Sequence, residues 1–328
     1  MRIAVVGAGA IGGWLAVRLA QSGEDVSVLA RGAMLAAIRE NGLVLTEAGQ
    51  TIIANIPASD APEDLGPQDL VIVAVKGQAL ADVVPKIAAM LGPETSVLPA
   101  MNGVGWWFTH GLGAPLEGAT LQSIDPGGAI AQHIPPARVI GCVVHASSAL
   151  AAPGRILHTT GKRLIVGEPK GGDSTRLSRV AEALRNAGLD IQVSARIQQA
   201  VWYKLWGNMT MNPISALTGA TTDKILGDPL VRSFALAVMA EAKEVGARIG
   251  CGIAESGEDR MAVTGKLGAI KTSMLQDAEA GRPLELDALL AAPREIAQLA
   301  GVATPNMDAL HGLARLFDAA RQGALPSP

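Results

Sequence analysis

The amino-acid sequence predicts an α/β fold followed by an all-α region, namely an N-terminal Rossmann-type, doubly wound domain and a helical C-terminal domain. Three observations predict it. A glycine-rich loop between a strand and a helix opens the chain, short β-rich runs alternate with helical runs after it, and strand-like runs stop near Ser194. Because a chain of 328 residues exceeds what one core usually supports, we expect two domains, 1–194 and 195–328.

The first unit of this fold is a strand–loop–helix–strand segment. The buried strand RIAVV precedes GAGAIGG, which is followed by the helical run WLAVRLAQSG and the strand DVSVLA. Gly7 permits a tight turn, Gly9 lets backbone approach a pyrophosphate, and Gly12 allows close packing of helix and strand. The helix N-terminus also presents free N–H groups to an anion. We expect this loop to bind a dinucleotide, the alternative being a turn without a ligand; its residues are Gly7, Ala8, Gly9, Ala10, Ile11 and Gly12.

The end of the second strand bears on the choice of dinucleotide. NAD sites usually place Asp or Glu there to bind the ribose hydroxyls, but the sequence reads VLARGAML, with Arg31 directly after the strand. A guanidinium can bind a 2′-phosphate with paired hydrogen bonds. The sequence therefore favours NADPH over NADH, and a solvated arginine is the alternative.

Further strands are expected to complete the sheet. DLVIVAV and TSVLPA read as buried strands, after a hairpin around Glu47 to Gln50, and they end at Lys76 and Asn102. Ligands of open α/β sheets bind beyond the carboxyl ends of the strands, where both side chains join Arg31. We therefore predict that both residues contact the cofactor. The alternatives are a solvated side chain at a strand end for Lys76 and an ordinary Asn-Gly turn for Asn102. RVIGCVVHASSAL, GRILHT and KRLIVGE read as later strands, and Thr175 to Asn186 as a helix.

The helical region begins with VWYKLWGNMTMNP, an apolar segment that carries one polar stripe. Lys204, Asn208 and Asn212 recur every four residues, which places them on one helical face. If this stripe faces a substrate beside the cofactor, the Lys204 ammonium could stabilise the charge that builds up on a carbonyl oxygen during reduction and could supply a proton. The two amides could bind carboxylate or hydroxyl groups of the substrate. The alternatives are interhelical hydrogen bonds and a lysine that reaches solvent. Pro213 predicts a kink or helix end at Asn212.

Composition argues against several other classes of protein. The balance of 27 basic to 30 acidic residues gives no electrostatic reason to expect nucleic acid or an anionic membrane as a partner. The uncharged run 3–17 is too short and too glycine-rich for a membrane span. Five histidines and two cysteines show no ligand spacing, so we expect no metal, two reduced thiols and a cytoplasmic protein.

Two C-terminal segments, KLWGNMTMNPISALTG and SMLQDAEAGRPLELDAL, resemble the ketopantoate reductase (2-dehydropantoate 2-reductase) family, and GAGAIGG, VLAR, VK and NG occur in the same order as in that family. The resemblance implies an NADPH-dependent oxidoreductase that reduces the ketone of ketopantoate to (R)-pantoate, in pantothenate and coenzyme A biosynthesis. It implies a helical domain like the C-terminal domain of 6-phosphogluconate dehydrogenase, with the active site between the domains. The expected partner is a small-molecule substrate, a 2-oxo acid. Assembly into a homodimer is left open.

Carried over residue by residue, the resemblance implies roles that spacing alone does not give. Lys204 would be the general acid, and Glu285 would bind the substrate hydroxyl and help to hold that lysine. NADPH phosphate contacts are implied for Arg31 and Lys76. Substrate contacts are implied for Asn102, which also meets the nicotinamide, and for Asn208, Asn212 and Ser273.

Some residues depart from the family pattern. Met101 stands where many members have glutamine, and Thr222 is the nearest match to an asparagine that contacts substrate in some members. Trp106 and Trp107 make the following loop more aromatic. These departures leave open another 2-oxo acid or an opine-type imine as substrate. A third alternative is an NADPH-binding protein without activity, but loss of the lysine or glutamate would be its usual mark and both Lys204 and Glu285 are present.

Overall fold

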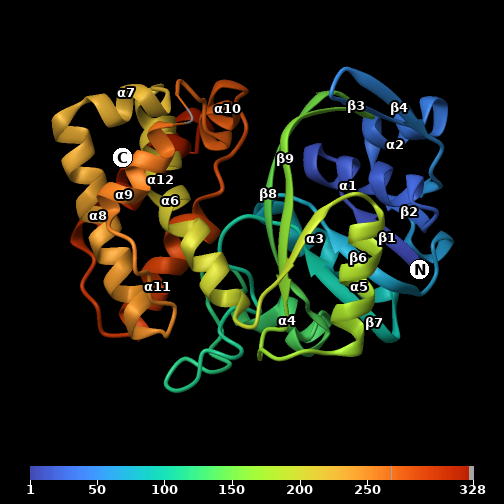
Figure 1. The fold of residues 1–328 in the computed structure, drawn as a ribbon, viewed down its shortest axis with the longest axis horizontal. Coiled ribbons are helices and arrows are strands. Elements are labelled where there is room, and N and C mark those ends of the chain that lie inside the picture. Colours follow the sequence, from blue (N-terminus) through green and yellow to red (C-terminus); the bar gives the residue numbers. More distant parts are fainter. Residues whose placement is uncertain (267, 325–328) are drawn as a thin grey trace.

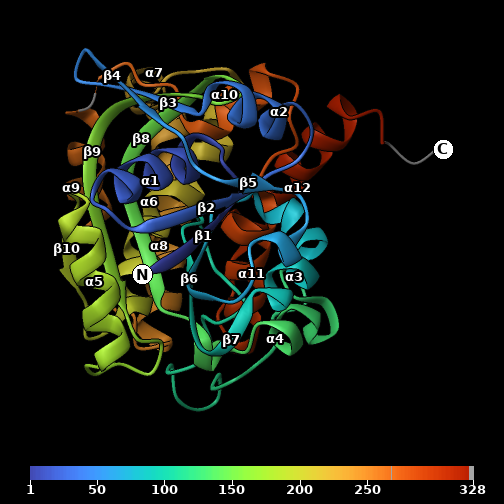
Figure 2. The same cartoon turned by 90° about the vertical axis from the view of Figure 1, so that its right-hand side faces the viewer.

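The computed structural model describes residues 1–266 and 268–324, and it divides into an α/β part and a helical part that lie side by side (Figure 1). Seen from the α/β side, the helical part lies behind the sheets (Figure 2). The last strand, β10 (Asp190–Val193), is followed only by helical elements within the described residues. The Rossmann-type α/β fold followed by a helical region, predicted from the sequence, is confirmed.

The first sheet is parallel throughout, in the order β5-β2-β1-β6-β7. Because its strands are parallel, their carboxyl ends meet at one edge, where the glycine-rich loop also lies. The strands are β1 (Arg2–Val6), β2 (Asp25–Leu29), β5 (Ala58–Ser59), β6 (Gln68–Val73) and β7 (Leu91–Pro99), and the helices between them are α1 (Ala10–Gln21), α2 (Gly32–Asn41) and α3 (Leu80–Ala89).

A second, mixed sheet is built from the remaining strands. It has the order β10-β9-β3-β4, with β8 antiparallel to β9; the strands are β3 (Leu43–Glu47), β4 (Gln50–Ala54), β8 (Gly141–Ala152) and β9 (Arg155–Gly167). The predicted hairpin is confirmed, because Glu47 pairs with Gln50. GRILHT and KRLIVGE, expected as separate strands, form the single strand β9, in which Gly161 adopts φ +76. The predicted helix is α5 (Thr175–Asn186).

The helical part is organised around α6 (Ile197–Thr218), which contacts most of the other helices. A helix end at Asn212, one of the two outcomes predicted for Pro213, is wrong because α6 continues to Thr218; a kink there stays a prediction. Proline removes one backbone hydrogen bond, but this half of α6 is buried among its neighbours, and that packing stabilises the helix. The other helices are α7 (Thr222–Gly227), α8 (Pro229–Arg248), α9 (Gly257–Gly265), α10 (Ser273–Glu279), the π-helical turn η5 (Asp287–Ala291), α11 (Ala292–Leu299) and α12 (Pro305–Arg321).

The two parts share a continuous apolar core. Phe108, from the loop after β7, stacks on Trp202 of α6 with ring centroids 6.1 Å apart. Trp107 packs so closely on the start of β8 that a Cβ at Gly141 would lie 2.5 Å from its ring. Burial of such large side chains, at about 25 cal/mol per Å² of apolar surface, holds α6 against the carboxyl edge of the first sheet.

Candidate active site

The glycine-rich loop after β1 has the shape of a phosphate cradle. Gly7 adopts φ +90, and a Cβ at Gly12 would lie 1.9 Å from the carbonyl oxygen of Gly7, so neither position has room for a side chain. Apart from Gly9 itself and its two neighbours in the chain, no heavy atom of the described residues lies within 4 Å of the place where a Cβ at Gly9 would be. Helix α1 begins at Ala10 without a side-chain cap and without an acidic residue in its first turn. The loop therefore offers open space over uncapped N–H groups, which fits the pyrophosphate of a dinucleotide.

Two cations flank this loop at the carboxyl edge of the sheet. Arg31 is exposed and immediately precedes α2, two residues after β2 ends. Lys76 lies three residues after β6 ends. Since β1 lies between β2 and β6, these strands are about 10 Å apart, on opposite sides of the glycine loop. Their contact with a cofactor stays a prediction.

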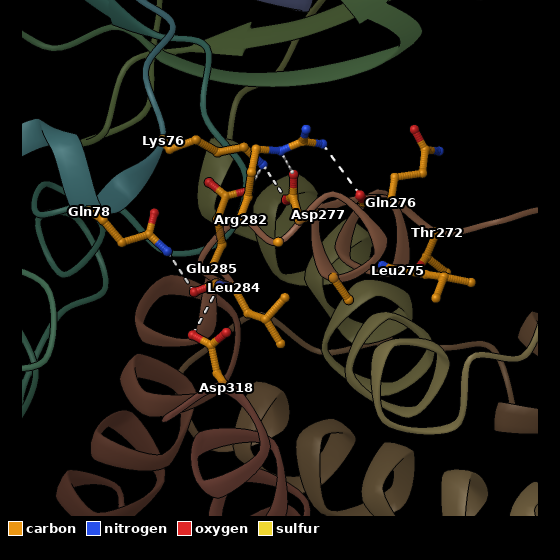
Figure 3. A network of polar contacts seen from close by, with 12 residues as sticks. Lys76, Gln78, Thr272, Leu275, Gln276, Asp277, Arg282, Leu284, Glu285 and Asp318 are labelled. Carbon is orange, nitrogen blue, oxygen red and sulfur yellow. Dashed lines mark hydrogen bonds and ion pairs between the residues drawn. The ribbon is translucent and has the colours of Figure 1, made fainter. Parts of the chain in front are cut away.

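Lys76 also bridges the two parts of the molecule (Figure 3). Its Nζ lies 2.8 Å from Oδ2 of Asp277 in α10 and 2.7 Å from Oε2 of Glu285, just before η5. Gln78 adds a second link by donating to the carbonyl oxygen of Leu284 at 2.5 Å. Burial alone would lower the pKa of Lys76, but the carboxylates of Glu285 and Asp277 outweigh it and raise the pKa above its usual value.

Asp277 is a residue that sequence reasoning missed. It is 4% exposed, and it also accepts a bond of 2.8 Å from Nε of Arg282. A buried carboxylate requires paired cations, and here one of its two partners comes from the other part of the molecule. The sequence does hold one signal for Asp277. It follows the predicted substrate residue Ser273 by four residues in SMLQD, and residues four apart share a helical face.

Lys204 is held by different groups. Its Nζ donates to Oδ1 of Asn102 at 2.9 Å and to the carbonyl oxygen of Val144 at 2.6 Å, so β7, β8 and α6 converge on one ammonium. Both acceptors are uncharged. Burial lowers the pKa of Lys204 to about 8, and the Cys142 thiol and the Glu285 carboxylate offset part of that effect. The structure brings Lys204 and Asn102 together, whereas Glu285, expected beside Lys204, is hydrogen-bonded to Lys76.

The other predicted substrate residues lie along the same helix or next to it. Asn208 lines a small crevice together with Lys204 and Asn102. Asn212, one turn further along α6, is buried. Ser273 is the exposed first residue of α10, which packs on α6. Their contact with a substrate stays a prediction.

A larger cavity of about 220 Å³ adjoins that crevice. Both are lined by Met101, Asn102 and Cys142, and the cavity extends between the strand ends of β6 and β7 towards Trp106 and Trp107. Both tryptophans are buried, and Nε1 of Trp106 donates to the carbonyl oxygen of Ile134 at 2.9 Å. The aromatic loop therefore forms a fixed wall of the cavity.

Thr222 has a different environment from the one its weak family match implied. It is 4% exposed, and its hydroxyl donates to the carbonyl oxygen of Gly268 at 2.6 Å and accepts from the Ile270 N–H at 3.2 Å. Both bonds hold the turn before α10. Because its donor is already used inside the protein, Thr222 is a poor replacement for a substrate-binding asparagine.

In 1–266 and 268–324, no three His, Cys, Asp or Glu side chains gather closely enough to hold a metal ion. No helix among these residues is both long and apolar enough to cross a membrane.

Comparisons with known proteins cover nearly the whole chain. A family profile described as "Ketopantoate reductase PanE/ApbA" matches residues 3–107, and "Ketopantoate reductase PanE/ApbA C terminal" matches residues 196–318. A 2-dehydropantoate 2-reductase of Mesorhizobium japonicum is 46% identical over 316 residues, which cover 96% of this chain and 97% of that protein. A solved protein of Ralstonia solanacearum MolK2, itself assigned only provisionally as a ketopantoate reductase, is 56% identical, with a TM-score of 0.94 and 99% of each chain covered. The 2-dehydropantoate 2-reductase of Methylococcus capsulatus is 28% identical, with a TM-score of 0.84 and 98% of each chain covered.

Proposed function

Because the chain belongs to the ketopantoate reductase family of oxidoreductases, we propose that it reduces the ketone of ketopantoate to (R)-pantoate with NADPH. The observation that carries this proposal is the pairing of Lys204 with Asn102 at the carboxyl edge of a dinucleotide-type sheet. Family membership was implied by the sequence motifs, and the comparisons confirm it.

The geometry of Lys204 suits a general acid. An ammonium has three N–H donors, and Asn102 and Val144 accept two of them, which leaves the third for a substrate oxygen. With a pKa of about 8, the amine is protonated at neutral pH yet gives up its proton more readily than an ordinary lysine. We propose that this proton goes to the ketone oxygen as negative charge builds up on it.

The residues at the sheet edge fit a nicotinamide cofactor. The open glycine loop would bind its pyrophosphate, and Arg31 would bind the 2′-phosphate that distinguishes NADPH from NADH. When bound, the cofactor would supply the hydride. The cavity beside Asn102, at the ends of β6 and β7, would enclose the reacting end and exclude water from it.

The polar stripe of α6 would orient the substrate. We propose that Asn208, Asn212 and Ser273 bind its oxygen atoms and that Glu285 binds its hydroxyl group. The carboxylate of Glu285 is fixed by Lys76 across the cleft, so the substrate would meet a positioned acceptor.

The direct test is loss of the NADPH absorbance band with ketopantoate, with NADH and bulkier 2-oxo acids run in parallel. Fast turnover with NADPH and ketopantoate is expected. Preference for a bulkier acid would favour the second candidate, a reductase of another 2-oxo acid. The structural reason to include that candidate is the wall of Met101, Trp106 and Trp107 beside the site. NADPH binding without turnover of any acid would overturn the proposal in favour of a silent binder.

Arg31 tests the choice of dinucleotide separately. We predict that Arg31→Ala raises KM for NADPH about 10- to 100-fold and leaves KM for NADH nearly unchanged, because a charge-assisted pair with the 2′-phosphate is lost. Arg39→Ala is the matched control, since it removes the same charge from the other end of α2. Equal effects on both cofactors would show that Arg31 does not contact the 2′-phosphate.

A further inference from the structure

Several cations gather on the β8 side of α6. His145 on β8 pairs in register with Arg163 on β9, and Lys204 and Arg260 approach the same imidazole from the helical part. Burial, followed by the charges of Lys204, Arg163 and Arg260, lowers the pKa of His145 to about 4, so this histidine is neutral at physiological pH. The result is a concentration of positive charge around His145 and beside Lys204, of the kind that attracts a small anion.

Arg260 contributes a guanidinium that is only partly hydrogen-bonded within the described residues. It belongs to α9, its Nη1 lies 3.4 Å from the Thr264 hydroxyl, and its guanidinium lies 5.7 Å from the centre of the Tyr203 ring. Its Nε is buried without a hydrogen-bond partner among the described residues. A buried N–H without an acceptor is costly, and a guanidinium offers its donors in the flat arrangement that a carboxylate matches.

A glycine brings this guanidinium against α6. A Cβ at Gly207 would lie 2.5 Å from Nη2 of Arg260 and 3.1 Å from its Cζ, and the three nearest atoms are all in that one side chain. Gly207 follows Lys204 by three residues and directly precedes Asn208. The arginine therefore lies over the part of α6 that carries the proposed acid, and only a residue without a side chain leaves it this room.

We infer that Arg260 binds the carboxylate of the 2-oxo acid and thereby determines that the substrate is an acid. This inference rests on the proposed function. In a 2-oxo acid the carboxylate is bonded to the carbon that bears the ketone, so a ketone oxygen at Lys204 brings the carboxylate within one helical turn of that lysine. The unused donors of Arg260 meet that requirement, and His145, whose pKa is lowered, adds no charge beside them at neutral pH.

The test compares an acid with its uncharged analogue. KM is measured with NADPH for the 2-oxo acid that the wild-type enzyme reduces and for its methyl ester, in the wild type, Arg260→Met, Arg260→Lys and Gly207→Ala. For Arg260→Met we expect KM for the acid to rise about 10- to 100-fold, while KM for the ester and Kd for NADPH stay the same. Gly207→Ala should move in the same direction because it displaces the guanidinium without removing its charge. Arg260→Lys should recover part of the loss.

A matched control removes a positive charge elsewhere. Arg248→Met, on the exposed face of α8 where Arg248 pairs with Glu244, should change neither KM. Equal losses for acid and ester in Arg260→Met would overturn the inference and indicate a structural role, and a weaker Kd for NADPH alone would indicate a cofactor contact instead. If Arg260→Met does not fold, an unchanged acid KM in Gly207→Ala overturns the inference. Failure of the wild type to reduce any 2-oxo acid would overturn the proposed function as well, so the two failures are distinguishable.

Discussion

Two lysines face the same cleft and have opposite properties. Lys76, after β6, touches two carboxylates and has a raised pKa. Lys204, on α6, is buried against an amide and a carbonyl oxygen and has a pKa of about 8. Deeper burial lowers the pKa of Lys204, whereas the two carboxylates outweigh burial at Lys76, so only Lys204 suits the proposed role of proton donor.

Because of this difference, we propose different tasks for the two lysines. Lys76 remains protonated throughout the physiological range, and its ion pairs join the first sheet to the segment that carries Asp277 and Glu285. Lys204 can lose its proton near neutral pH while neutral acceptors hold its Nζ in place.

The largest expected effect belongs to Lys204. Lys204→Met should lower kcat by about 100- to 10,000-fold, because the developing alkoxide loses both its proton donor and its stabilising charge. Kd for NADPH, measured by fluorescence titration, should stay within about twofold, since no cofactor contact is assigned to this amine. Lys76→Met provides the comparison and should lower kcat far less. Equal losses of kcat in the two variants would remove the distinction between acid and fixed cation.

The next effect is the dependence of turnover on pH. If Lys204 is the proton donor, as proposed, reduction requires its protonated form, so kcat should be flat below the pKa of about 8 and should fall about tenfold per pH unit above it. Oxidation of the hydroxy acid requires the neutral amine, so its rate should rise with pH and level off above 8. Lys76 does not titrate in this range because its pKa is raised. A reduction rate that stays constant to pH 10 would exclude Lys204 as the proton donor.

The contrast between the lysines also shows how far the sequence can be interpreted. The glycine loop follows from local rules, because Gly12 meets the carbonyl oxygen of Gly7 within the same loop, and the face shared by Lys204 and Asn208 follows from helical spacing. The pairing of Lys76 with Asp277 joins residues 201 positions apart, and no local pattern indicates it. Arg260 escaped prediction for the same reason, since its position depends on how α9 packs on Gly207. Within α6, packing outweighed the local signal of Pro213.

The smallest effect tests the fixed cation itself. Asp277→Asn should lower Tm by about 1–3 °C, because the ion pairs with Lys76 and Arg282 are lost while the shape of the side chain is kept. The loss is small because the Lys76 side chain is 48% exposed and water screens its charge, and Glu285 continues to hold the amine. Glu279→Gln breaks an exposed pair with Lys271 and should leave Tm unchanged. The pH dependence of kcat should also be unchanged in Asp277→Asn, because Lys204 sets it. A shift in the pH dependence of kcat would mean that Lys76 and Lys204 are coupled through Glu285. The two lysines would then titrate as one linked system and not as independent groups.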